Sequence, residues 1–391
     1  MIKKLFLPLF VLTIAFCWGC APKKENLPTV DYVEVIPPKY ANAGEFCEGL
    51  ALVYFGDGKC GYIDTSGREV MPLRYESADN FSEGLALVKL DGKYGFVDTN
   101  GREITPLKYD YSYKEGFSNG MSLVMFDDKY GFIDRNGSEV VPLKYEDADK
   151  FSEGMAPVCL DGKWGYIDKA GKEIIPLKYD YAGLFSEGLT VVVLDGKWGY
   201  VDKNDREVIP LKYDYSGEFS KGMAIIRLKD KYGFIDMTGK EVVPPKYAYV
   251  WDFSEGMARI MVDGDLHGYI DTDGNEVVPP KYDSIDEGFQ SKCNFCEGLA
   301  VVKLRDKGFG FIDKNGNEVI PLQYDYAWDF SEGFAAICLN SKWGYIDTTG
   351  NLVVPFIYDF AGSFSEGLAA VWLMEEFGGK MGFITIKDTA K

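Results

Sequence analysis

The sequence predicts an all-β protein made of ten tandem β-repeats, and three observations support this fold class. A four-residue marker, Phe followed by Ser or Cys, a variable residue and Gly, recurs at a nearly constant interval. Short β-branched and aromatic runs, punctuated by Gly and Pro, fill the intervals, as is typical of strands. The apolar residues of these runs show no helical periodicity.

The marker defines the repeating unit. Successive markers begin 34 to 36 residues apart, except for one interval of 42. So regular a period indicates one supersecondary unit that stacks on its neighbours. The units occupy residues 34–391, which leaves no room for a separate catalytic domain. The markers begin at Phe46, Phe81, Phe117, Phe151, Phe185, Phe219, Phe253, Phe295, Phe330 and Phe364.

Each unit predicts a three-stranded antiparallel meander, closed by an irregular connection. In the fourth unit, the marker at 151–154 precedes runs at 156–160 and 162–168, and a turn leads into a third run at 173–176. Asp161–Gly162 favours a two-residue hairpin, because both central positions of a type I′ turn need positive φ. The proline that ends the third run cannot donate to a ladder, so we expect a strand end or an edge there.

The second run of each unit predicts a sheet with two apolar faces. The period of two places Trp164 and Tyr166 on one face and Ile167 on the other. Such a sheet cannot stand alone, but stacking on the preceding and following units buries both faces. We expect an elongated solenoid or superhelix, with a closed β-propeller as the alternative. Propeller blades usually hold four strands in about 40 to 50 residues, whereas these units predict three strands.

The amino terminus predicts export and lipid anchoring. Residues 1–19 have the order of a lipoprotein signal peptide, with Lys3 and Lys4 before a short apolar run. Gly19–Cys20 resembles the lipobox of bacterial lipoproteins, which predicts lipidation of Cys20. Residues 20–33 are then a polar tether. We expect a location in the bacterial cell envelope, at the outer membrane or cell surface, with an ordinary signal peptide or uncleaved anchor as the alternative.

Charge and composition narrow the function classes. The formal net charge of −19 disfavours nucleic acid as a partner. His267 is the single histidine of the chain, which removes most histidine-based nucleophilic and metal chemistry. We therefore expect no enzymatic activity and no cofactor. We also expect the protein to be a monomer and to contact the membrane only through its N-terminal lipid.

The second run also carries a family resemblance. Trp164–Gly165, Trp198–Gly199 and Trp343–Gly344, with the surrounding Gly-Tyr-Ile-Asp and Phe-Ser-Glu-Gly phrases, resemble the WG repeat family. Four units place Tyr or Phe before the glycine, and three place Cys60, His267 or Met381 there. The resemblance implies an extracytoplasmic β-repeat scaffold and says little about a ligand.

The leading functional hypothesis is a scaffold that binds an envelope protein. A carbohydrate- or peptidoglycan-binding protein is the alternative, in which Trp164, Trp198 and Trp343 stack on sugar rings; burial of these rings between units would exclude that role. An enzyme with a site at the insertion in unit eight is a weaker possibility.

Cys293 and Cys296 lie at the end of that insertion, residues 284–294. Their C-x-x-C spacing favours a disulfide or a simple Ser replacement over a metal or redox site. His267, which stands where other units have Trp or Tyr, is expected to be a packed or partly exposed substitute rather than a catalytic base.

Overall fold

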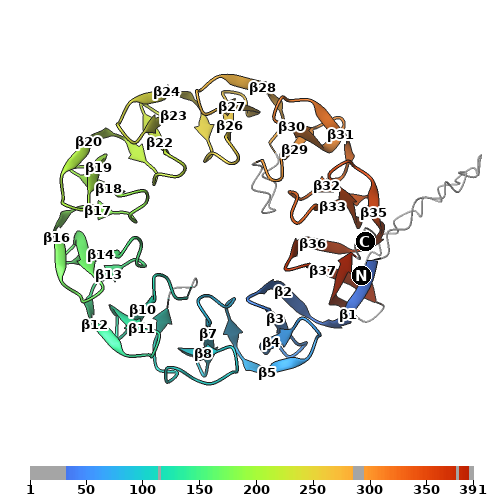
Figure 1. The fold of residues 1–391 in the computed structure, drawn as a ribbon, viewed down its shortest axis with the longest axis horizontal. Coiled ribbons are helices and arrows are strands. Elements are labelled where there is room, and N and C mark those ends of the chain that lie inside the picture. The colour runs from blue at the N-terminus through green and yellow to red at the C-terminus, as the bar shows by residue number, and fades with distance from the viewer. Residues whose placement is uncertain (1–31, 113–115, 285–294, 376–377, 387–391) are drawn as a thin grey trace, which may run out of the picture.

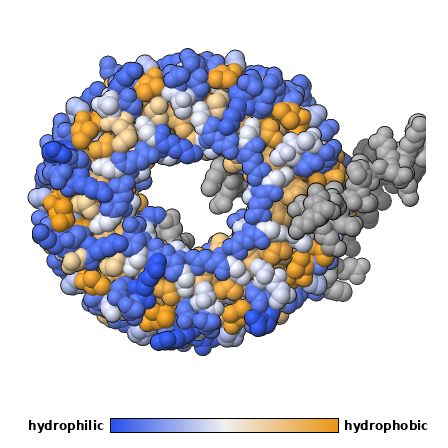
Figure 2. Space-filling view, viewed as in Figure 1, coloured by the Kyte–Doolittle hydropathy of each residue, from blue (hydrophilic) through white to orange (hydrophobic). Residues whose placement is uncertain are grey.

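The computed structural model describes residues 32–112, 116–284, 295–375 and 378–386. These residues form ten small antiparallel sheets, called blades 1 to 10, which follow one another around a closed ring (Figure 1). Figure 2 shows an open centre whose inner rim is mostly hydrophilic. The described residues include no helix with the length and hydrophobicity needed to cross a membrane.

In the first five blades the strands follow the chain from the innermost strand outward. These strands are β2 (Asn42–Cys47), β3 (Leu50–Tyr54), β4 (Cys60–Asp64) and β5 (Glu69–Tyr75) in blade 1; β6 (Ser77–Ala78), β7 (Leu85–Leu90) and β8 (Lys93–Asp98) in blade 2; β9 (Tyr111–Ser112), β10 (Met121–Phe126), β11 (Lys129–Asp134) and β12 (Glu139–Tyr145) in blade 3; β13 (Asp147–Ala148), β14 (Met155–Leu160), β15 (Lys163–Asp168) and β16 (Glu173–Tyr179) in blade 4; and β17 (Tyr181–Ala182), β18 (Leu189–Leu194), β19 (Lys197–Asp202) and β20 (Glu207–Tyr213) in blade 5.

The other five blades follow the same order, except that the outer strand of blade 10 is β1. Their strands are β21 (Tyr215–Ser216), β22 (Met223–Leu228), β23 (Lys231–Asp236) and β24 (Glu241–Tyr247) in blade 6; β25 (Tyr249–Val250), β26 (Met257–Val262), β27 (Leu266–Asp271) and β28 (Glu276–Tyr282) in blade 7; β29 (Leu299–Leu304), β30 (Gly308–Asp313) and β31 (Glu318–Tyr324) in blade 8; β32 (Tyr326–Ala327), β33 (Phe334–Leu339), β34 (Lys342–Asp347) and β35 (Leu352–Tyr358) in blade 9; and β36 (Phe360–Ser365), β37 (Leu368–Glu375), β38 (Gly378–Ile386) and β1 (Tyr32–Tyr40) in blade 10.

The predicted three-stranded meander needs a correction, because most blades have a fourth strand. The additional inner strand is only two residues long in blades 4 to 7, such as β17, so it leaves no alternating run in the sequence. The segment regarded as an irregular connection contains this strand. The outer strand is also longer than expected and carries Pro176 in its middle, which an edge strand tolerates.

The ring closes through the first described strand. β1 pairs antiparallel with β38, with Tyr32 opposite Ile386 and Tyr40 opposite Met381. Residues 34–40 read Glu-Val-Ile-Pro-Pro-Lys-Tyr, nearly the same sequence as the outer strand of blade 7. The N-terminal segment thus supplies the outer strand of blade 10. The closed propeller, the alternative interpretation, is therefore the observed arrangement, and the elongated solenoid is not.

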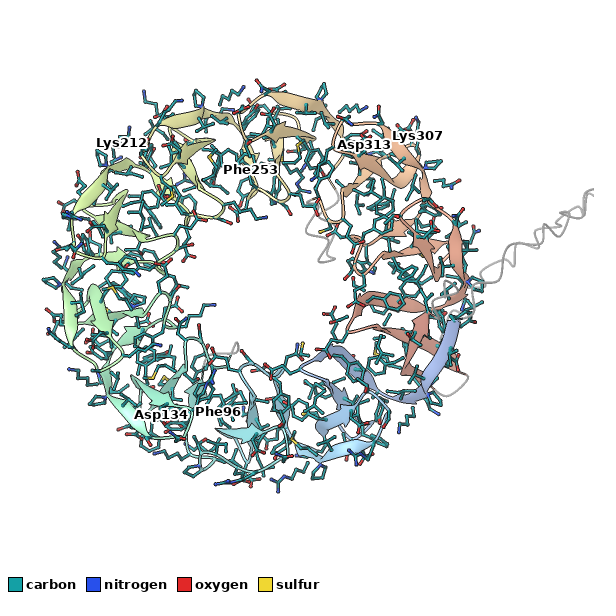
Figure 3. All side chains as sticks on the ribbon, viewed as in Figure 1. Phe96, Asp134, Lys212, Phe253, Lys307 and Asp313 are labelled. Atoms are coloured by element: carbon teal, nitrogen blue, oxygen red, sulfur yellow. The ribbon has the colours of Figure 1, made fainter. Side chains whose placement is uncertain are left out.

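Hydrophobic cores lie between the blades. At each interface the marker phenylalanine packs against an aromatic ring from the third strand of the preceding blade, with ring centroids 4.7 to 5.0 Å apart. Phe46 and Phe383 make this contact at the closure, at 5.0 Å. Figure 3 shows Phe96 and Phe253 within the body of the ring, while Lys212 lies on its outer rim. The prediction that stacking buries both faces of each sheet is confirmed.

The glycine of the Trp-Gly pair is required by the outer strand. Trp164 pairs with Tyr179 and Tyr166 with Ile175, so the outer strand bulges over Gly165 between these pairs. A Cβ atom on Gly165 would lie 2.5 Å from the carbonyl oxygen of Ile175. Backbone atoms cannot move aside cheaply, so only glycine fits there.

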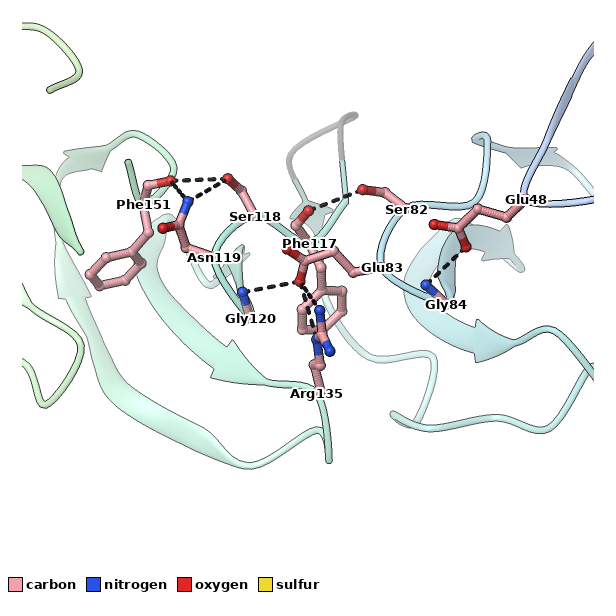
Figure 4. A network of polar contacts seen from close by, with 10 residues as sticks. All are labelled: Glu48, Ser82, Glu83, Gly84, Phe117, Ser118, Asn119, Gly120, Arg135 and Phe151. Carbon is pink, nitrogen blue, oxygen red and sulfur yellow. Dashed lines mark hydrogen bonds and ion pairs between the residues drawn. The ribbon is translucent and has the colours of Figure 1, made fainter. Parts of the chain in front are cut away.

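The marker joins neighbouring blades through hydrogen bonds (Figure 4). Ser118 Oγ donates to the carbonyl oxygen of Phe151 at 3.0 Å, and Gly120 N–H donates to the carboxylate of Glu83 at 3.0 Å. The same bonds cross the closure, where Ser365 Oγ donates to Phe46 O at 3.0 Å. The marker therefore repeats because it holds the ring together.

The two faces of the ring differ in the turns that they carry. The turn between the second and third strands, such as Asp161–Gly162, lies on one face, which we call the hairpin face. The marker turn, such as 151–154, lies on the opposite face, which we call the marker face. Antiparallel order requires this alternation, because each successive turn reverses the chain.

Candidate functional site

In the blades that have an aromatic residue before the glycine, that residue lies at the hairpin-face rim of the interface. Trp198 is the second residue of β19 and pairs with Val193 on one side and Tyr213 on the other. Its ring packs against the core between blades 5 and 6 but remains partly exposed. The residue thus covers the core while presenting one part of the indole to solvent.

Partly exposed rings form a continuous aromatic track along blades 4 to 6, defined as Trp164, Tyr181, Trp198 and Tyr215. Successive ring centroids are 6.0, 5.5 and 5.0 Å apart. Tyr181 is 41% exposed and Tyr215 is 38% exposed. Each tyrosine is the first residue of an inner strand, directly after the linker from the preceding blade. The chain thus places one ring from each strand end on the same face.

A cavity of about 630 Å³ extends from this track along the inner strand of blade 6. It lies open because Gly217, the third residue of the inner segment of that blade, has no side chain. A Cβ there would meet only ordinary contacts, the nearest being Ile225 Cβ at 3.8 Å. The cavity is lined by Tyr181, Ser186, Val191, Trp198, Tyr215, Ser216, Gly217, Glu218, Phe219, Ser220, Ile225, Tyr249, Val250, Trp251 and Asp252.

Two carboxylates line this cavity. Burial raises the pKa of Glu218; the backbone N–H of Leu184, which donates to its Oε1 at 3.1 Å, and Lys150 oppose that rise, whereas Asp149 adds to it. Burial alone raises the pKa of Asp252. Both residues are nevertheless exposed, so the cavity walls remove only part of the hydration of their carboxyl groups. The cavity is therefore a negatively charged, aromatic-walled recess.

The far wall of the cavity comes from blade 7. Tyr249 and Trp251 have ring centroids 4.7 Å apart, and Trp251 lies 5.3 Å from His267. The guanidinium of Arg259 sits over the Trp251 ring at 3.5 Å from its centroid. A cation is thus already stacked on one ring of this wall.

The corresponding region of blades 9 and 10 is covered by Trp328. This ring is nearly parallel to Trp343 at 5.8 Å, and its Nε1–H donates to the carbonyl oxygen of Ala361 at 3.1 Å. Trp343 is only 8% exposed as a result. A smaller cavity of about 420 Å³ remains beside it, lined by Tyr326, Cys338, Ser341, Trp343, Asp359, Phe360 and Trp372.

The three predicted tryptophans are thus not equivalent. Trp164 and Trp198 are partly exposed within the aromatic track, whereas Trp343 is buried in the core between blades 9 and 10. Of the three, only the first two present a surface on which a ligand could stack.

Of the other predicted site residues, the structure describes His267 and Cys296. His267 is 3% exposed and occupies the aromatic position of blade 7. Cys296 stands in the serine position of its marker and pairs with Leu299. Cys20 and Cys293, like residues 285–294 of the insertion, lie outside the described residues.

The acidic turns of the chain are structural. Asp271 Oδ1 accepts hydrogen bonds from the backbone N–H groups of Asp273 and Asn275, at 3.0 and 2.8 Å. Each such carboxylate is therefore used to stabilise its own turn. The described part of the chain contains no group of His, Cys, Asp and Glu side chains arranged to hold a metal ion.

Sequence reasoning missed Tyr181, Tyr215, Glu218 and Asp252. They lie in the short inner segment that carries no strand signal. Aligning the four residues before each marker phenylalanine would have exposed them, since this segment varies from Tyr-Ala-Gly-Leu to Tyr-Ser-Gly-Glu and Tyr-Val-Trp-Asp in blades 5 to 7.

Ten radially arranged blades of three or four strands, joined into a closed ring, define a β-propeller. The chain belongs to the family described as WG containing repeat. The family model matches ten segments: residues 33–60, 61–94, 94–130, 130–164, 164–198, 198–232, 232–264, 268–307, 309–343 and 343–371.

Comparison with solved structures found similarity at low sequence identity. A eukaryotic initiation factor matches with a TM-score of 0.49 at 12% identity, over 75% of this chain and 92% of that chain. BamB from Moraxella catarrhalis matches with a TM-score of 0.32 at 11% identity, over 92% and 99%. Apo AztD from Citrobacter koseri matches with a TM-score of 0.35 at 13% identity, over 72% and 88%. No curated protein matches the sequence.

Proposed function

We propose that this protein is a non-enzymatic, lipid-anchored platform of the bacterial cell envelope that binds a protein partner on its hairpin face. The observation that carries the proposal is the aromatic track, in which rings of three successive blades touch one another and stay partly exposed. Tyr and Trp rings supply large contact areas at protein interfaces, and their polar ends tolerate water before the partner binds.

The extent of the track favours a macromolecular partner. The rings of Trp164 and Tyr215 are separated by two further rings, and the cavity continues the surface to Trp251 in blade 7. A contact area that covers four blades exceeds what one small ligand uses. In this proposal the protein acts as a monomer, uses no cofactor and does not bind nucleic acid.

The direction of β1 supports display of the hairpin face. β1 begins at Tyr32 opposite Ile386, where β38 ends on the marker face. A tether from a lipidated Cys20 would therefore join the ring from the marker face. Its extended length is about 40 Å, so the ring can stand clear of a membrane with the hairpin face turned outward.

A glycan, such as peptidoglycan, is the second candidate ligand. The partly exposed rings of Trp164 and Trp198, with Tyr181 between them, favour it, because sugar rings stack on aromatic faces.

The test measures which molecules the purified full chain retains. The chain is immobilised and incubated separately with purified sacculi and with solubilised envelope proteins. We expect one envelope protein to be retained, and we expect a Tyr181→Ser, Trp198→Ala double variant to lose it. The matched control is Ile174→Ser, which removes an exposed apolar side chain from the outer strand of blade 4.

Each outcome decides between the candidates. Retention of sacculi alone, lost in the double variant, would replace the protein partner with a glycan. A retained protein that the double variant still binds would place the interface elsewhere on the ring and overturn the proposal.

A further inference from the structure

The geometry points to the cavity of blades 5 to 7 as the recess that receives an arginine or lysine side chain from a basic segment of the partner protein. This inference rests on the proposed function and deepens it. The recess combines two carboxylates with aromatic walls, and no lysine or arginine is among the described residues that line it.

The aromatic walls are arranged to favour a cation. Trp198 and Tyr215 have ring planes inclined at 50° with centroids 5.0 Å apart, and Tyr249 and Trp251 form the opposite wall at 71°. The faces of such rings carry partial negative charge. The Arg259 guanidinium over Trp251 shows the same pairing within this fold.

The two carboxylates supply the charge complement. Glu218 and Asp252 come from adjacent blades and line the same cavity, with Asp149 near enough to act on Glu218. Lys150 acts on Glu218 and the Arg259 guanidinium lies over Trp251, so two positive charges stand against three carboxylates and the group remains net negative. A bound guanidinium or ammonium would offset the partial desolvation of these two carboxylates, Glu218 and Asp252.

The size and position of the cavity fit a peptide side chain better than an isolated ion. About 630 Å³ accommodates a long side chain with part of its backbone. The recess is continuous with the aromatic track, which offers the neighbouring residues of an extended segment a surface to cover. The chain's net charge of −19 would steer a basic segment toward the ring.

The fold itself shows how the recess can be closed. In blade 9, Trp328 occupies the position of Gly217, covers Trp343, and donates to Ala361 in the next blade. Gly217 does not have positive φ, and its Cβ direction is open. A Gly217→Trp variant should therefore fill the recess as Trp328 does.

The experiment measures peptide binding to the purified full chain by calorimetry at low salt. The probes are a short peptide of alternating Arg and Ser, the same peptide with citrulline in place of arginine, and a chito-oligosaccharide. We expect only the arginine peptide to bind. Glu218→Gln and Asp252→Asn should each weaken binding about tenfold, and Gly217→Trp should abolish it.

The matched control is Glu207→Gln, which removes an exposed carboxylate from the outer strand of blade 5 and should leave the affinity unchanged. Thermal unfolding verifies that Gly217→Trp folds, and the two isosteric variants provide the test if it does not. Equal affinity for the arginine and citrulline peptides, or binding that ignores Glu218 and Asp252, would overturn the inference. Binding of the oligosaccharide alone would overturn it as well.

Failure of this inference is distinguishable from failure of the proposed function. If an envelope protein is retained through Tyr181 and Trp198 but equally well by the Glu218→Gln and Gly217→Trp variants, the platform stands and the cationic recess does not. If the arginine peptide binds through Glu218 while no envelope protein is retained, the recess stands without the proposed partner.

Discussion

Blades 6 and 9 have the same strand order and nearly the same motifs, yet they leave different surfaces. In blade 6, Gly217 leaves a cavity of about 630 Å³ along the inner strand. In blade 9, Trp328 stands at the position of Gly217 and covers Trp343, which is 8% exposed, whereas Tyr232, the residue of blade 6 that corresponds to Trp343, remains partly exposed. The exposure of the aromatic residue before the Trp-Gly glycine therefore does not depend on that residue alone. It depends on which residue occupies the third position of the inner segment of the same blade.

The largest expected effect comes from uncovering blade 9. Trp328→Ala removes the stack on Trp343, the contact with Phe360 and the hydrogen bond to Ala361, and it should lower the free energy of unfolding by about 3 kcal/mol. Trp198→Ala should cost about 1 to 2 kcal/mol, because Trp198, which like Trp328 is partly exposed, makes ring contacts but no side-chain hydrogen bond to another described residue. Urea denaturation measures both. Equal losses would show that the two regions are packed alike.

The next largest loss of stability should be the same in both regions. In each of them the outer strand passes close to the glycine that follows the aromatic residue. A Cβ atom on Gly233 of blade 6 would clash with the carbonyl oxygen of Val243, and one on Gly344 of blade 9 would clash with that of Val354, both in the outer strand of the same blade. Substitution of either by Ala should cost about 2 kcal/mol. Gly95→Ala is the control, because its nearest contacts in the irregular blade 2 are at 3.2 Å, and it should cost less than about 1 kcal/mol.

A smaller shared effect concerns the marker bonds. Ser186 Oγ donates to Phe219 O at 2.7 Å and Ser331 Oγ donates to Phe364 O at 2.8 Å. Alanine at either position leaves a partly buried carbonyl without this donor and should cost about 1 kcal/mol. Thermal unfolding of both variants tests this. A loss confined to one region would mean that the marker does not stabilise the ring uniformly.

The smallest effect is a pH dependence of opposite sign in the two regions. Burial raises the pKa of Asp252, so the folded state binds its proton more tightly than the unfolded state. Stability then falls as the pH rises from the ordinary aspartate pKa through the raised one. Asp252→Asn removes this penalty and should stabilise the protein at pH 7 by less than about 1 kcal/mol, with no gain at pH 3.

Asp359 beside Trp343 provides the contrast. Partial burial acts to raise the pKa of Asp359, but hydrogen bonds from Lys342 and from the backbone N–H of Met374 hold it below the usual value. Its contribution to stability is present above the ordinary aspartate pKa and is lost as the pH falls through the lowered one. Asp359→Asn should therefore destabilise at pH 7 and have little effect at low pH. Denaturation at the two pH values gives both signs in one series.

The repeat, its strand content and its hairpin turns could be predicted from the sequence because they depend on local interactions. The Asp161–Gly162 turn requires positive φ, and the alternation around Trp164 sets which residues share a face. The fourth strand could not be predicted, because two residues such as Tyr181 and Ala182 are too few to show an alternating pattern.

By itself, the sequence determined that ten equal units bury their cores against one another. Only the tertiary structure decided that the stack closes, because closure requires residues 34–40 to pair with a strand more than 300 residues away, and no local signal reports such a pairing. The open recess was likewise decided in three dimensions. Glu218 and Asp252 stand at equivalent positions of successive blades, and the packing of blade 6 against blade 7 brings them to one cavity.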